Sequence, residues 1–162
     1  MNITIRTLTE ADIENVQHVV TKSWNDTYEG VIPLDIQMQF LREAYSKESL
    51  IYRILHSHFF VAELAGEIVG FANFSLMESD GLVELGALYL LPSVKGQGIG
   101  TLLLETGLER IGRVKKVLVH VEKQNHHALQ FYKKKGFIYM NEFGEIFYGH
   151  PLQTMQLMLY LN

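Results

Sequence analysis

The sequence predicts an α/β domain, and three of its features carry that prediction. In the first third of the chain, apolar residues such as Ile13, Val16 and Val20 recur at helical spacing. Later they alternate or run together as they do in strands, most clearly over 82–91. A glycine-rich loop follows that run and leads into a Leu-rich helix over 98–111. Strand and helix patterns that follow one another in this way favour a single unit with a central sheet and flanking helices.

Composition and charge narrow the class of protein. The chain has 162 residues, the size of one domain, and we expect residues 1–162 to form it. A hydrophobic fraction of 48% argues against disorder, and a net charge of −4 argues against nucleic acid as a partner. No cysteine is present, which excludes disulfides and a thiol nucleophile. No apolar run reaches the ~18 residues that span a bilayer. We therefore expect a cytoplasmic protein without a membrane partner.

The first half of the chain predicts one strand and three helices. Ile3 and Ile5 alternate with polar residues, as in an opening strand. Thr9 and Asp12 have the spacing of a capping box, with Asp in place of Glu, and start a helix that runs toward Trp24. The remaining elements expected here are a loop over 25–33, a helix over 34–45 and a helix from 46 to about 56.

The second half predicts strands around two helices. The expected elements are strands 59–64 and 68–77 joined by a tight turn, a strand over 82–91 covered on both faces, the helix 98–111, a strand at 117–121, a helix over 125–135 that ends at Gly136, and closing strands 137–140 and 147–161. The apolar tail fits an internal strand or the edge of a homodimer equally well.

The stretch SVKGQGIG presents glycine at alternate positions, Gly96, Gly98 and Gly100, where a buried strand gives way to a helix. Backbone N–H groups at a helix N-terminus form an anion site, and glycine lets a phosphate approach them closely. The stretch lacks the Gly-Lys-Ser/Thr of a Walker loop and the G-x-G-x-x-G spacing of a dinucleotide fingerprint. The alternative is a turn that only tightens the packing of strand against helix.

Two segments together resemble the GNAT acetyltransferase superfamily. LYLLPSVKGQGIGTLLL is similar to its acetyl-CoA-binding motif, although Lys95 stands where the family usually has Arg or Gln. NHHALQFYKKKGF matches a second family segment at Asn125, Ala128, Phe131, Tyr132, Gly136 and Phe137. The resemblance implies a mixed, mostly antiparallel sheet of about six to seven strands, in which a splayed strand pair holds the coenzyme.

The resemblance also implies a set of acetyl-CoA-binding residues. Backbone N–H groups from Lys95 to Thr101 would hold the pyrophosphate, and the strand before the loop would pair with the pantetheine arm. Gly86 is a candidate bulge that splays this strand. The full set is Leu88, Tyr89, Leu90, Lys95, Gly96, Gln97, Gly98, Ile99, Gly100, Thr101, Asn125, Ala128, Phe131 and Tyr132.

Transfer of an acetyl group to an amine requires three catalytic contributions. The resemblance places Tyr132 as the general acid for the departing thiolate; the alternative is aromatic packing. The N–H of Leu88 is a candidate donor to the oxyanion. Glu84 is the only ionisable group in the strand 82–91, and the period of two puts it on one face with Leu82, Gly86 and Leu88. It is a candidate general base, directly or through a water, or else a surface ion-pair partner.

The acceptor side carries the weakest pattern. SWNDTYEGVIP resembles a segment of some of these acetyltransferases that overhangs the acceptor, so Trp24, Asp26, Tyr28 and Glu29 are candidates to bind a cationic amine. The alternative is that the two aromatic residues belong to the core and the two acids are solvated. Phe147, Tyr148 and His150 are candidates for an opposite wall.

We expect no metal, because the adjacent His126 and His127 point about 100° apart on a helix and would not easily bind one ion together.

The resemblance as a whole implies an acetyl-CoA-dependent N-acetyltransferase that acts on a small-molecule amine. A protein N-terminus or lysine as acceptor, and a CoA-binding sensor without catalysis, are the alternatives; a nicotinamide-dependent oxidoreductase fits less well.

Overall fold

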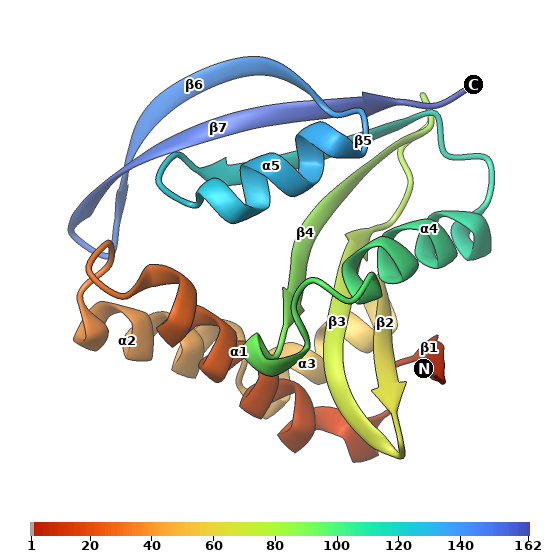
Figure 1. Ribbon diagram of the computed structural model, residues 1–162, viewed down its shortest axis with the longest axis horizontal. Helices are drawn as coiled ribbons and strands as arrows, with labels where there is room; N and C mark the ends of the chain where they lie inside the picture. Colours follow the sequence, from red (N-terminus) through yellow and green to blue (C-terminus); the bar gives the residue numbers. More distant parts are fainter. Residues whose placement is uncertain (1) are drawn as a thin grey trace.

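The computed structural model describes residues 2–162 and contains a seven-stranded sheet in the order β1-β2-β3-β4-β5-β7-β6 (Figure 1). Neighbouring strands are antiparallel except β4 and β5, which are parallel. The mixed, mostly antiparallel sheet expected from the sequence is thereby confirmed. The strands are β1 (Ile3–Thr7), β2 (Ser57–Leu64), β3 (Glu67–Ser75), β4 (Leu82–Leu90), β5 (Lys116–Glu122), β6 (Ile138–Phe147) and β7 (His150–Tyr160).

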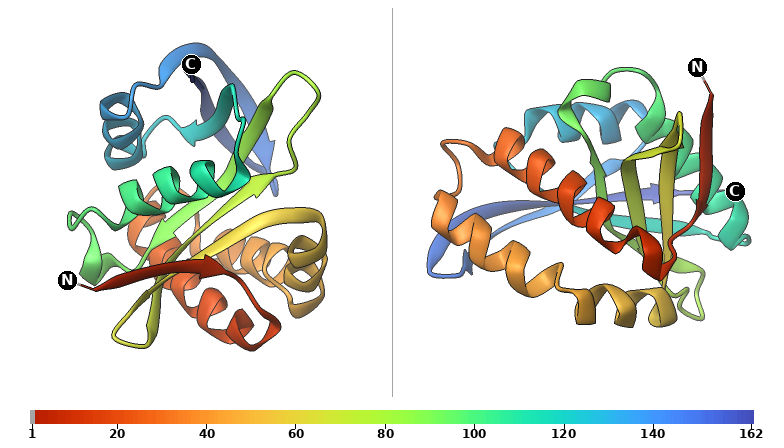
Figure 2. Two further views of the ribbon diagram at one scale, coloured as in Figure 1. Left: turned by 90° about the vertical axis from the view of Figure 1, so that its right-hand side faces the viewer. Right: turned by 90° about the horizontal axis from the view of Figure 1, so that it is seen from below.

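Helices cover the two faces of the sheet unequally (Figure 2). One face carries α4 (Ile99–Ile111), which contacts β1 to β4, and the other carries α1 (Ile13–Tyr28), α2 (Leu34–Ala44) and α3 (Lys47–His56). The remaining α-helix is α5 (His126–Lys134), between β5 and β6 in the chain. The buried apolar residues accordingly form two clusters, one on the α4 side and one around α1 to α3. Among residues 2–162, no helix combines the length and the apolar character needed to cross a membrane.

Three predicted boundaries are wrong. Helix α1 continues to Tyr28, so four residues assigned to the loop 25–33 are helical. Strand β6 extends to Phe147 instead of ending at 140, because an edge strand exposed to solvent carries polar residues such as Asn141 and Glu145 and has no apolar alternation. The last strand begins at His150, after a turn at Tyr148 and Gly149. It lies between β5 and β6, so the apolar tail is an internal strand and not an edge.

Strands β4 and β5 pair only at their beginnings. The ladder runs from Leu82 and Lys116 to Glu84 and Leu118 and then stops, although both strands continue. At the same point β4 is irregular against β3: Phe74 pairs with Leu85 and Asn73 with Ala87, so Gly86 is left without a partner. An unpaired residue of this kind is a β-bulge, which bends its strand. The bulge expected at Gly86 is confirmed, and the two strands diverge beyond it (Figure 1).

The bulge also changes which face each residue of β4 occupies. Val83 and Leu85 belong to the cluster under α4, whereas Ala87 belongs to the cluster around α1. Glu84 and Leu88 therefore lie on opposite faces, and the prediction of one shared face is wrong, because a period of two does not survive an inserted residue. Glu84 is exposed, so this part of β4 is not covered on both faces as expected.

The start of α1 is tied to β1 and β2 by charged groups. The Asp12 carboxylate accepts from the Thr9 N–H at 2.9 Å, which confirms the capping interaction, and it pairs with Arg6 at 2.7 Å. Arg6 also contacts Glu63 on β2 at 2.8 Å. The hydrogen bond from Arg6 lowers the pKa of Asp12 to about 2, below its ordinary 3.8. The carboxylate is therefore more stable in the folded chain than in the unfolded one.

Replacement of Asp12 by Asn should lower the free energy of unfolding at pH 7 by on the order of 2 kcal/mol. The lowered pKa means that this contribution is complete above about pH 4 and is lost as the pH falls toward 2. Urea unfolding at several pH values should show wild type and Asp12→Asn converging at low pH. The exposed Glu10→Gln in the same turn is the control, and an equal difference at pH 2.5 and pH 7 would contradict the assignment.

Candidate active site

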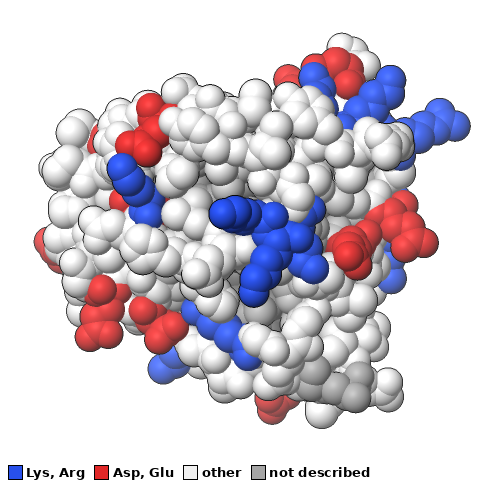
Figure 3. Space-filling view, turned by 45° about the horizontal axis from the view of Figure 1, so that its top comes forward, with Lys and Arg blue, Asp and Glu red and all other residues white. Residues whose placement is uncertain are grey.

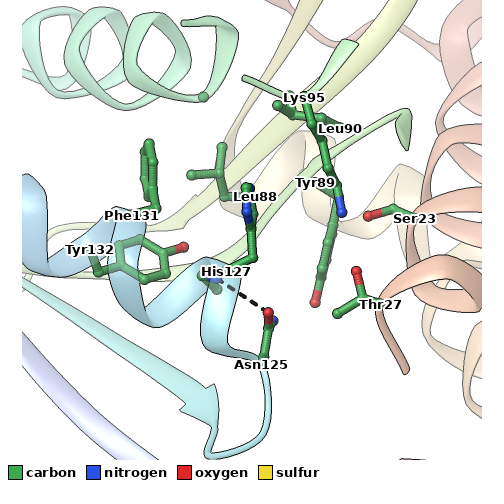
Figure 4. Close-up of a pocket in the computed structure, with 12 residues that line it drawn as sticks. Ser23, Thr27, Leu88, Tyr89, Leu90, Lys95, Asn125, His127, Phe131 and Tyr132 are labelled. Atoms are coloured by element: carbon green, nitrogen blue, oxygen red, sulfur yellow. Dashed lines mark hydrogen bonds between the residues drawn. The ribbon is translucent and has the colours of Figure 1, made fainter. Parts of the chain in front are cut away.

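A cavity opens where β4 leaves β5, between β4, α1 and α5 (Figure 4). We call it the β4–α5 cavity. A second cavity, the strand-gap cavity, lies between the diverging strands and shares Leu88, Tyr89, Asn125, Ala128 and Tyr132 with the first. The lining of the β4–α5 cavity is Ser23, Thr27, Leu88, Tyr89, Leu90, Lys95, Gly100, Asn125, His127, Ala128, Phe131 and Tyr132. Nine residues expected to bind the coenzyme, Gly100 among them, thus meet at one place from three separate segments of the chain.

Tyr132 lies at the junction of the two cavities. Its helix α5 is fixed at the start by the Asn125 side chain, which accepts from the Ala128 N–H at 3.2 Å, and is followed by Gly136 at a φ of +96°. Tyr132 is only 6% exposed and packs against Phe131 and Phe137, and its hydroxyl points into the space in front of Leu88 (Figure 4). Burial raises the pKa of Tyr132 well above its ordinary value. The phenol therefore keeps its proton throughout the neutral range.

The backbone of β4 presents a free edge to both cavities. Leu91 N–H donates to Val69 O on β3 at 2.8 Å. Alternate residues of a strand direct N–H and C=O to the same side, so Tyr89 also faces β3. Leu88 and Leu90 therefore direct their amide groups to the opposite side, from which β5 has already diverged. An extended ligand with amide groups can pair with this edge as an additional strand would.

The glycines of the loop before α4 serve two different purposes. Gly96 and Gly98 have φ of +77° and +84°, and a Cβ added at either would meet nothing within 4 Å. Their Cα hydrogens therefore border open space at the N-terminus of α4, where N–H groups have no acceptor within the helix. Gly100 instead packs against Phe131, whose ring lies 3.4 Å from the position of a Cβ. Of the two alternatives that the sequence left open, close packing describes Gly100, whereas Gly96 and Gly98 border the open space that the approach of a phosphate would require.

A third cavity, the glycine-loop cavity, adjoins this helix terminus. Its lining includes Gly96, Gly98, Thr101, Lys134 and Lys135, and the buried Ile99 also borders it, whereas Gln97 lines neither this cavity nor the β4–α5 cavity. Basic side chains gather near the middle of one face of the molecule, with most acidic groups toward its margins (Figure 3). Unpaired N–H groups beside ammonium groups make a favourable position for phosphates.

Lys95 and Asp26 form an ion pair that the sequence did not predict. Lys95 Nζ lies 3.2 Å from Asp26 Oδ2, and Lys95 lines the β4–α5 cavity. The pair joins the glycine loop to α1. Asp26 was expected beside the acceptor with Glu29, but the structure separates the two: Asp26 contacts Lys95, whereas Glu29, the first residue after α1, borders another cavity.

The other acceptor candidates are divided between the core and two cavities. Trp24 is 6% exposed and stacks on Phe40 with 4.5 Å between the ring centroids, so its side chain belongs to the core and does not line a cavity. Tyr28 is also buried in the core but lines the strand-gap cavity. Glu29 borders a separate cavity by the α1–α2 loop with His150, whose Nε2 lies 3.0 Å from Val31 O.

The remaining two candidates for the opposite wall hold the β6–β7 turn against the helices. Phe147 packs against Phe40 at 5.2 Å between ring centroids, and Tyr148 donates a hydrogen bond to Glu43. The turn therefore lies against α2, and His150, which follows it, contacts the α1–α2 loop at Val31.

Glu84 has a partner on β5. His120 Nδ1 lies 3.0 Å from Glu84 Oε1, and His120 lines the strand-gap cavity with Tyr132. Glu84 was a candidate from the sequence, whereas His120 was not. The signal was present in the alternation of β5: Val117, Val119 and Val121 are buried, which puts His120 on the opposite face. Ser23, Thr27 and His127, which also line the β4–α5 cavity, were missed because their patterns carry no chemical signature.

Comparison with known proteins identifies the family. Residues 20–137 match the model of the acetyltransferase (GNAT) family, and the chain belongs to it. It is an acyltransferase of this family.

Particular relatives support the same class. The spermidine N(1)-acetyltransferase of Thermoplasma acidophilum is 35% identical over 147 residues, which cover 85% of this chain and 89% of the relative. The PaiA N-acetyltransferase of that organism, solved in complex with coenzyme A, superimposes with a TM-score of 0.85 at 27% identity. The match covers 99% of this chain and 100% of the PaiA chain. The protein smu.2055 of Streptococcus mutans has a TM-score of 0.79 at 25% identity, covering 98% and 99%.

Replacement of Gly98 by Val should weaken the binding of CoA at least tenfold, because the added methyl groups occupy the open space at the α4 terminus. The matched control is Gly66→Val, since Gly66 has a similar φ of +81° and equally open surroundings but lies in the β2–β3 turn. Both variants should lose a similar ~1–2 kcal/mol of stability from the left-handed backbone conformation. Titration calorimetry with CoA should separate them, and equal affinities would contradict a phosphate site at the loop.

Proposed function

We propose that this protein transfers the acetyl group of acetyl-CoA to a primary amine of a small molecule, by direct attack while both substrates are bound. The observation that carries the proposal is the position of the Tyr132 hydroxyl. It lies where the β4–α5 cavity meets the strand-gap cavity, facing the free edge of β4. Coenzyme A is bound in the related PaiA structure, and a second relative bears the name of a spermidine acetyltransferase.

The residues present fit the parts of acetyl-CoA. N–H groups at the start of α4, beside Lys134 and Lys135, suit the phosphates. The amide groups of Leu88 and Leu90 suit the two amides of the pantetheine arm. The β4–α5 cavity then directs the thioester end toward Tyr132 and the strand-gap cavity. Acetyl-CoA supplies the activated acyl group, and the protein fixes its position.

Two groups of this chain act on the reacting thioester. The Leu88 N–H points to the side of β4 where the carbonyl would lie, and it stabilises the negative charge that develops on that oxygen. The Tyr132 phenol gives its proton to the sulfur as the C–S bond breaks. Because burial holds the pKa of Tyr132 above that of a thiol, the phenol is fully protonated before the reaction, and its proton passes to the sulfur only together with the breaking of the C–S bond. Burial also keeps water from hydrolysing the thioester.

The acceptor enters from the side of the sheet that carries Glu84 and His120. Tyr28 of α1 borders the same strand-gap cavity, and burial raises its pKa to about 12, so it is neutral and donates hydrogen bonds. The carboxylates of Glu84 on β4 and of Glu122 on β5 lie on this side of the sheet. Negative charge beside a narrow cavity suits a cationic acceptor such as a polyamine.

Replacement of Tyr132 by Phe should lower kcat by a factor of about 10²–10⁴ and leave the KM for acetyl-CoA nearly unchanged. Phe keeps the ring packing against Phe131 and Phe137, so the fold is retained. Thiol release from acetyl-CoA with a panel of amines that includes spermidine, propane-1,3-diamine, amino acids and a peptide with a free N-terminus measures both parameters.

The control is Tyr160→Phe, an exposed tyrosine at the end of β7. Wild-type protein that binds acetyl-CoA but transfers its acetyl group to no amine would contradict the proposed function. Unchanged kcat in Tyr132→Phe would remove the phenol from the mechanism and leave the activity standing.

A further inference from the structure

The Glu84–His120 pair sits at the last rung where β4 and β5 are joined. Glu84 is opposite Leu118 in the final pair of the ladder, and His120 is two residues further along β5, on the same face. The pair therefore spans the mouth of the gap through which the strand-gap cavity passes. His120 borders that cavity, whereas Glu84 stands behind it and contacts the imidazole at 3.0 Å.

The contact fixes which nitrogen of His120 carries the proton. A carboxylate only accepts hydrogen bonds, so the neutral imidazole must place its hydrogen on Nδ1, the atom next to Glu84 Oε1. Nε2 is then left with a lone pair. A carboxylate that orients a histidine in this way also stabilises the imidazolium formed when Nε2 takes up a proton.

We propose that His120 Nε2 is the general base that accepts a proton from the acceptor ammonium, with Glu84 as the residue that positions it. This inference rests on the proposed function and refines the role expected for Glu84 from the sequence. Glu84 contacts the imidazole and is not among the residues that line the strand-gap cavity, so it acts through His120.

The other groups around His120 are less suited to the role. Tyr28 on α1 and Tyr132 on α5 keep their protons, because burial raises the pKa of each phenol. Glu122, the next residue on this face of β5, is 8% exposed and accepts from the Gln124 N–H, so it is engaged in the turn that follows. Gln156 of β7 is opposite His120, Asn141 of β6 follows in the same register, and the ring of Phe143 lies 6.0 Å from the imidazole; none of these side chains is ionisable.

Each proton in the reaction has a donor and an acceptor. The acceptor nitrogen arrives as an ammonium and gives one proton to His120 Nε2, which later releases it to solvent. The free amine attacks the thioester carbon, the C–N bond forms, and the C–S bond breaks. Tyr132 protonates the departing sulfur, and the second proton lost by the nitrogen returns to Tyr132 through water. The products are an amide, a thiol and one proton, with no oxidant or reductant required.

The test compares His120→Asn, Glu84→Gln and a control across pH in the thiol-release assay, with spermidine or the best amine of the panel. Asn keeps an amide donor near the Nδ1 position, so Glu84 retains a partner and the fold is preserved. The control is His18→Asn, an exposed histidine on α1. Circular dichroism and CoA affinity should match the wild type in all three variants.

We expect kcat of His120→Asn to fall about 10²–10⁴-fold at neutral pH, while the KM for acetyl-CoA stays within about threefold. In the wild type, kcat should fall as the pH is lowered, because a protonated base cannot accept a proton, and should reach a plateau at higher pH. His120→Asn should lack that plateau and rise steadily with pH.

Glu84→Gln should lower kcat about tenfold or more and leave the KM for acetyl-CoA nearly unchanged, because an amide can donate to Nδ1 as well as accept from it, and Nε2 is then no longer kept free of its hydrogen. A purely structural role for Glu84 would leave kcat of the folded variant unchanged. An active His120→Asn with the wild-type profile, or a folded Glu84→Gln with the wild-type kcat, would overturn the inference while the acetyltransferase function stands. Wild-type protein without transfer to any amine would overturn both.

Discussion

The early end of the β4–β5 ladder is the constraint on which the rest of this site depends. A parallel pair that continued past Glu84 and Leu118 would bond the amides of Leu88 and Leu90 and close both cavities. The bulge at Gly86 bends β4 away at that point, and the β3 side of the strand remains paired to Leu90. One edge of β4 is thus held by β3, while the opposite edge is free to pair with a ligand. This free edge lies at the centre of the sheet and not at its margin.

The same divergence divides the chemistry between two sides of the sheet. Toward α4 and α5 lie the glycine loop and Tyr132, which we propose act on the phosphates and the thioester of acetyl-CoA. Toward α1, Glu84 and His120 flank the opening through which an amine would arrive. Because the bulge reverses the orientation of the residues after it, a single strand supplies Glu84 to one side and Leu88 to the other. The acyl donor and the acceptor can therefore meet without sharing a cavity entrance.

Much of this arrangement was accessible from the sequence, because it rests on local patterns. The glycine loop, the Asn125 cap and the Gly136 stop are each encoded within a few residues, and their elements lie where predicted. The limits of prediction were long-range. The Lys95–Asp26 and Glu84–His120 contacts join residues 69 and 36 positions apart. The face of Glu84 was misjudged because a bulge breaks the period of two, and β6 was cut short because its solvent-exposed edge has no apolar alternation.

Amide hydrogen exchange at Leu88 and Leu90, measured by NMR with and without saturating CoA, reports directly on the free edge of β4. In the free protein, both amides should exchange much faster than the amide of Tyr89, which pairs with β3, and CoA should slow the exchange of both. Amides of Leu88 and Leu90 that are already as protected as Tyr89 in the free protein, or that CoA leaves unchanged, would contradict this expectation.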